Sequence, residues 1–141
     1  MRRVKEYEGA LLELGPSVDE GGVVNYTYIK IGDELIRNVY VYKRLRELLI
    51  SQVGNVDCKL WIAKHPFRLL IVAIRQYDGQ VYRIDLNALY ASAGALVVIL
   101  GVLLYVSPYM FTLFAFLGIY PAWLLYSLIS QVRPIEADYQ V

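Results

Sequence analysis

The sequence predicts an α+β membrane protein in which a small β-rich domain is followed by a two-helix transmembrane hairpin. Residues 86–132 contain no Asp, Glu, Lys, Arg or His, whereas nearly all charged residues precede them. The earlier segments are rich in β-branched and aromatic residues, and a Ser-Pro pair divides the long apolar stretch in two. Such separation of charged from apolar sequence is typical of membrane proteins.

We expect transmembrane helices at residues 88–106 and 109–129. Each is long enough to cross a hydrocarbon core of about 30 Å. Ser107-Pro108 separates them, because proline disfavours helical backbone in the preceding residue but fits the first turn of a new helix. One continuous helix would be far longer than a bilayer is thick, so the sequence favours a hairpin.

Basic residues predict the orientation of this hairpin. Every Lys and Arg except Arg133 precedes the first span, and the turn contains none. By the positive-inside rule, we expect both termini in the cytoplasm, with residues 130–141 as a short cytoplasmic tail. The first residues do not resemble a signal peptide. Together with the small size, this favours an integral protein of a bacterial inner membrane.

Small residues recur along both predicted spans, where they would let helix backbones approach closely in lipid. They can pack the hairpin on itself or pack it against further copies of the chain, and the first interpretation is favoured. These candidate helix-packing residues are Ala91, Gly94 and Gly101 in the first span and Ala115, Gly118 and Ala122 in the second.

Residues 1–86 are expected to form the β-rich domain, with one short amphipathic helix at about residues 43–53. Strands are expected at residues 5–14, 23–31, 35–42, 57–64, 67–76 and 80–86. The order, three strands, a helix and two or three strands, is similar to that of five-stranded barrels of the oligonucleotide-binding type. It fits a small open sheet on one helix equally well.

Four tyrosines form a candidate interaction face: Tyr26, Tyr28, Tyr40 and Tyr42. Alternate strand residues share a face, so a turn at Gly32-Asp33 could gather both pairs on one sheet surface. Stacking on nucleic-acid bases is one hypothesis. A cross-strand ladder that supports the hairpin is the favoured one.

Lys43, Arg44 and Arg46 open the predicted amphipathic helix and are candidate contacts for anionic lipid. Basic residues at a helix N-terminus oppose the helix dipole, which suggests another binding partner. The competing interpretation is an ordinary solvated helix face.

The residues favour no catalytic, cofactor or metal site. Cys58 and His65 are the single cysteine and the single histidine, so neither belongs to a recognisable dyad or ligand set. Cys58 is interpreted as a buried small residue and His65 as a turn residue.

We therefore expect a non-enzymatic, membrane-tethered interaction or accessory module, such as an immunity or exclusion protein or a subunit of a membrane complex. Its expected partners are membrane lipid and another membrane protein or a second copy of itself. The alternative is an oligonucleotide-binding-like domain that senses nucleotide or single-stranded nucleic acid. A net charge of +1 makes nucleic acid the less favoured partner.

Overall fold

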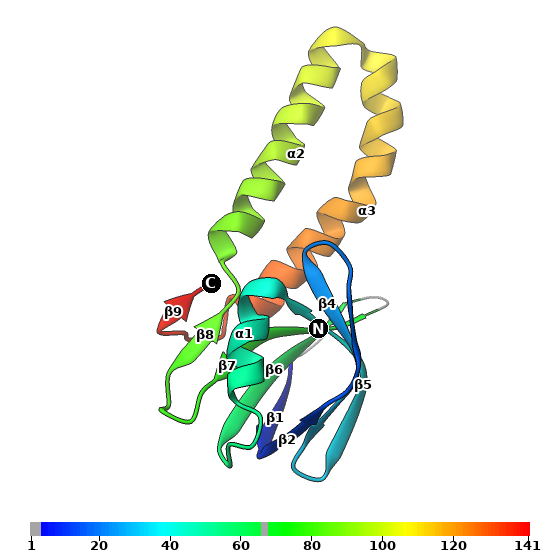
Figure 1. Ribbon diagram of the computed structural model, residues 1–141. Coiled ribbons are helices and arrows are strands. Elements are labelled where there is room, and N and C mark those ends of the chain that lie inside the picture. Colours follow the sequence, from blue (N-terminus) through cyan, green and yellow to red (C-terminus); the bar gives the residue numbers. More distant parts are fainter. Residues whose placement is uncertain (1–3, 66–67) are drawn as a thin grey trace. The chain divides into compact units, whose positions relative to one another are not determined.

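The computed structural model describes residues 4–65 and 68–141, which form two compact units (Figure 1). The β unit comprises Met1–Ile84 together with Gln131–Val141, and the helical unit comprises Asp85–Ser130. The chain thus leaves the β unit once, forms the helices, and returns to it. Residues at both ends of the sequence build one sheet.

The fold is α+β, with three helices and an open mixed sheet of nine strands. The helices are α1 (Lys43–Ser51), α2 (Leu86–Val106) and α3 (Pro108–Val132). The strands are β1 (Lys5–Gly9), β2 (Leu11–Leu14), β3 (Ser17–Asp19), β4 (Val23–Ile31), β5 (Glu34–Tyr42), β6 (Cys58–His65), β7 (Arg68–Arg75), β8 (Val81–Arg83) and β9 (Tyr139–Gln140).

The sheet is not closed, so the expectation of a small oligonucleotide-binding-like barrel is wrong and the open-sheet alternative holds. Its main path runs β1-β6-β7-β5-β4-β2, with β1 and β2 at opposite ends. These two strands were expected as one, but Gly9, at a φ of 149° that favours glycine, interrupts them. Between β1 and β2 the chain therefore passes from one edge of the sheet to the other.

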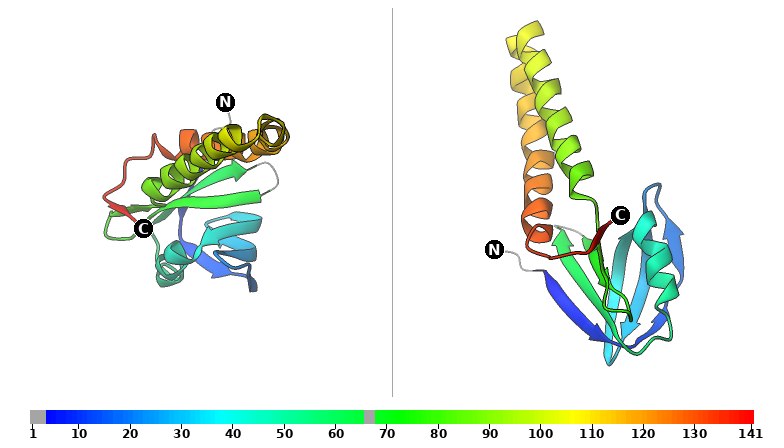
Figure 2. Two further views of the ribbon diagram at one scale, coloured as in Figure 1. Left: turned by 90° about the horizontal axis from the view of Figure 1, so that it is seen from above. Right: turned by 90° about the vertical axis from the view of Figure 1, so that its left-hand side faces the viewer.

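The core of the β unit lies around β7, whose residues Leu70–Ile74 are all buried. A run of consecutive apolar residues is expected where both faces of a strand are covered. On one face, α1 packs against β4, β5 and β7 and buries Leu45 and Leu49. The right-hand view of Figure 2 shows this helix lying across β4 and β5.

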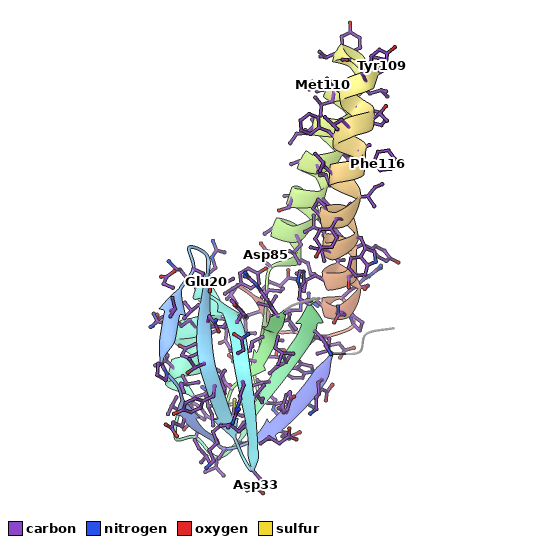
Figure 3. The ribbon with its side chains drawn as sticks, turned by 90° about the vertical axis from the view of Figure 1, so that its right-hand side faces the viewer. Glu20, Asp33, Asp85, Tyr109, Met110 and Phe116 are labelled. Carbon is purple, nitrogen blue, oxygen red and sulfur yellow. The ribbon has the colours of Figure 1, made fainter. Side chains whose placement is uncertain are left out.

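One edge of β7 is shared by two strands, so the sheet forks there. Leu69–Ile71 pair with β5 in parallel, whereas Ala73–Arg75 pair with β8 in antiparallel. The fork separates the long β4–β5 hairpin from the short β8–β9 pair. Figure 3 shows Glu20 and Asp33, which lie at the two turns beside β4, at opposite ends of the β unit.

The helical unit consists of two helices that are long and apolar enough to cross a membrane. The Asp85 carboxylate caps α2 by accepting a hydrogen bond from the Asn87 N–H at 2.8 Å. Ser107 ends α2, and its hydroxyl accepts from the Met110 N–H at 3.5 Å in the first turn of α3. Tyr109 and Phe116 project away from the helices in Figure 3.

Gly15 provides a test of the packing between β2, β3 and β4. A Cβ at this position would lie 2.6 Å from the Tyr28 ring and 2.7 Å from the Thr27 hydroxyl, whereas a Cβ on Gly22 would meet nothing within 4 Å. Gly15→Ala should therefore lower the free energy of unfolding by about 1–3 kcal/mol through overpacking. Gly22→Ala is the control, and equal denaturant midpoints for the two variants would contradict this packing.

Candidate functional site

The C-terminal residues 131–141 form a clasp with β8. The β9 strand pairs with β8 in parallel, opposing Tyr82 to Tyr139 and Arg83 to Gln140. The Asp138 N–H donates to the Val81 carbonyl at 3.0 Å, and the Asp138 carboxylate accepts from the Val81 N–H at 2.9 Å. Beyond β9, the Val141 N–H donates to the Arg83 carbonyl at 2.9 Å. The end of the segment expected as a cytoplasmic tail thus joins the sheet.

Side chains reinforce this clasp. The rings of Tyr82 and Tyr139 stack with centroids 5.1 Å apart, and the Arg83 guanidinium donates to the Ile135 carbonyl. Val132 and Ile135 are buried. Sequence reasoning missed the clasp because a two-residue strand carries no periodic signal. The sequence signal that came nearest to it was the presence of one tyrosine in each segment, Tyr82 and Tyr139, because aromatic pairs stabilise neighbouring strands.

Charged side chains form a connected network across β1, β6 and β7. Lys59 lies 2.7 Å from Glu6 and 3.8 Å from Glu8, and Arg75 lies 2.8 Å from Glu8 and 3.0 Å from Asp57. The Lys59 ammonium is the main cause of a lowered pKa at Glu6. Both cations are therefore compensated within the chain and offer little to an anionic ligand.

The expectation that four tyrosines could share one sheet surface is wrong, because the register of the β4–β5 hairpin separates the pairs. Tyr26 lies opposite Val39, whereas Tyr40 lies opposite Asn25. Directly opposed residues of an antiparallel pair share a face, and Tyr40 directly follows Val39, so Tyr26 and Tyr40 point to opposite sides of the hairpin.

Burial further reduces the tyrosine surface. Tyr26 and Tyr40 are buried, and the Arg68 guanidinium lies 4.5 Å from the centre of the Tyr40 ring. Burial raises the pKa of Tyr42. The Tyr28 hydroxyl donates to the Glu13 carboxylate, which is the main cause of a raised pKa at Tyr28.

The three candidate lipid contacts at the start of α1 differ in their surroundings. Lys43 lies 2.8 Å from Asp19, and the Tyr26 hydroxyl is the main cause of a raised pKa at Arg46. Arg46 also lies 3.8 Å from Glu47. Arg44 is exposed and forms no ion pair with the described acidic residues. Arg44 is thus the member of the trio with the most accessible charge.

Among the glycines of the two helices, Gly118 of α3 is the one that lies close to α2. A Cβ there would lie 3.8 Å from Leu100, whereas Cβ atoms on Gly94 and Gly101 would meet nothing within 4 Å. Ala91 is exposed, and Ala115 and Ala122 are half-buried. The face of α2 that carries Gly94 and Gly101 is therefore open in the single chain.

Cys58 is fully buried in β6, and burial raises the pKa of its thiol to about 12. A thiol held protonated in this way is a poor nucleophile at neutral pH. His65 is half-buried at the end of β6. Across residues 4–65 and 68–141, His, Cys, Asp and Glu side chains form no group of three or more that could hold a metal ion.

Comparison of the chain with family models, curated proteins and solved structures found no match to any of them. Its function must therefore be inferred from its own residues.

Asp138 provides a test of the clasp. Asp138→Ala removes the acceptor of the Val81 N–H and should lower the free energy of unfolding by about 1 kcal/mol, the usual net value of one hydrogen bond. Glu136→Ala is the matched control, because Glu136 is exposed and its carboxylate has no described hydrogen bond or ion pair. Thermal unfolding in detergent measures both, and an equal loss in the two variants would show that the clasp adds no stability.

Proposed function

We propose that this protein is a non-enzymatic interaction or accessory module, anchored in a bacterial inner membrane with its β unit at the cytoplasmic face. The observation that carries the proposal is the clasp, which builds the segments before α2 and after α3 into one sheet. Two crossings return the chain to the side from which it started, so both termini share that side. The hairpin and the sheet thus require the same topology.

Membrane insertion is supported by the character of the two helices. Their side chains are apolar and largely exposed, with Val97 at 69% and Leu117 at 64%. Water would penalise this much exposed apolar surface, whereas hydrocarbon would accept it. Tyr105 and Tyr109 flank the turn and are 93% and 90% exposed, as expected of aromatic residues at a membrane interface.

An interaction role is supported by the position and surface of the β unit. Ile84 and Asp85 are adjacent, so no linker separates the sheet from α2, and its partners would lie at or in the membrane. Exposed apolar side chains lie in the last turn of α1, in the loop after it and in the β7–β8 turn, where Tyr77 donates its N–H to Gln52. They are Ile50, Val53, Val56 and Tyr77.

The nucleic-acid alternative has less support. Base stacking required the four tyrosines on one face, and the hairpin register separates them. An oligonucleotide groove would also need uncompensated cations, whereas Lys43, Lys59 and Arg75 face carboxylates. We therefore retain the interaction module as the single proposal.

Topology is tested by thiol labelling in intact cells, in a Cys58→Ser background. Tyr109→Cys reports the turn, and Val56→Cys, at a site 81% exposed, reports the β unit. A membrane-impermeant maleimide should label position 109 from outside and position 56 only after permeabilisation. External labelling at position 56 would reverse the orientation. Labelling of both positions only after permeabilisation would show that the hairpin does not cross.

The interaction role is tested by photo-crosslinking in native membranes at native expression. A photoreactive residue in place of Val56 should capture a membrane protein or a second copy of the chain. The same residue in place of Glu47, on the solvated side of α1 with its side chain 78% exposed, is the control. Recovery of monomer alone from both positions would contradict the proposal.

A further inference from the structure

Arg83 is the buried cation of the clasp. It is 9% exposed, and its guanidinium donates to the Ile135 carbonyl through Nη1. Its Nε is buried without a hydrogen-bond partner. Within residues 4–65 and 68–141, no carboxylate lies within ion-pair distance of it. The Ile135 carbonyl thus stabilises the charge of Arg83 through its dipole, whereas carboxylates stabilise the charges of Lys59 and Arg75.

This arrangement is unusual on physical grounds. Burying a charge is costly unless the charge is paired and hydrogen-bonded. Lys59 and Arg75, on the same sheet and less buried, each face two carboxylates. Arg83 is a buried cation for which the described residues provide no counter-ion, so an external anion would complete the site.

The carboxylates of the clasp and of the residues just after Arg83 are engaged elsewhere or exposed. Asp85 accepts from the Asn87 N–H at the start of α2, and Asp138 accepts from the Val81 N–H. Glu136 is exposed and forms no ion pair in the described part of the chain. None of them neutralises the guanidinium.

A second guanidinium lies close by in the sequence of the clasp. Arg133 directly follows Val132, the last residue of α3, and is two residues from Ile135, whose carbonyl Arg83 contacts. Arg133 is exposed and forms no ion pair with the described acidic residues. Arg83 in turn lies two residues before Asp85, the cap of α2. One arginine thus marks each end of the helical hairpin.

We propose that Arg83 and Arg133 bind the phosphate of an anionic phospholipid, which supplies the counter-ion that the chain lacks. The planar guanidinium matches phosphate oxygens and binds them through paired hydrogen bonds. Residues that adjoin the ends of transmembrane helices lie at the depth of lipid headgroups. This inference rests on the membrane insertion proposed above and adds the class of lipid and the residues that recognise it.

The test uses the full chain in bilayer nanodiscs of phosphatidylcholine, with or without phosphatidylglycerol. A ligand that binds the folded state raises the midpoint of thermal unfolding, so phosphatidylglycerol should raise the midpoint of the parent protein. Arg83→Gln should lose most of this rise, and Arg133→Gln part of it. Arg37→Gln is the control, since it removes the same charge at an exposed position of β5. Inorganic phosphate added to phosphatidylcholine discs should produce no comparable rise.

Three results would overturn the proposal. Arg83→Gln could lower the unfolding midpoint equally in both bilayers, so that phosphatidylglycerol still raises it as in the parent protein. Arg83 would then stabilise the fold only through its hydrogen bond to Ile135. Arg37→Gln could lose the effect equally, which would indicate general surface charge. Inorganic phosphate could reproduce the effect, which would make a soluble anion the ligand. Failure of membrane insertion would appear separately, as release of the parent chain from membranes by alkaline carbonate.

Discussion

The pairing of β8 with β9 brings the C-terminal segment back into the β unit after the two long helices. It joins residues that are separated in sequence by the whole helical hairpin, and it makes both ends of that hairpin part of one sheet. A chain that leaves and re-enters the same unit can cross a bilayer only an even number of times.

The fork at β7 makes this arrangement possible. A strand has two edges, and β7 gives one to β6 and divides the other between β5 and β8. The half shared with β5 continues into the long β4–β5 hairpin and is covered by α1. The half shared with β8 leads to the clasp. One buried strand thereby supports both the core of the β unit and the clasp that follows the two apolar helices.

Several cations of the β unit lie close to carboxylates, as Lys59, Arg75 and Lys43 do. Such pairs on the surface contribute little stability individually, but they leave few free charges for unrelated anions. Arg83 departs from this pattern, because it is buried and contacts only a carbonyl. Arg83 lies two residues before Asp85, the N-cap of α2.

Local periodicity and proline geometry were enough to predict the two apolar helices, the break at Ser107-Pro108, α1 and most strands from the sequence. Which faces and edges meet depends on pairing between distant segments, which no local pattern specifies. The register of β4 and β5 separated Tyr26 from Tyr40, and the left-handed φ of Gly9 sent β1 and β2 to opposite edges. The clasp could not be foreseen, since β9 has two residues and becomes a strand only through pairing with distant β8.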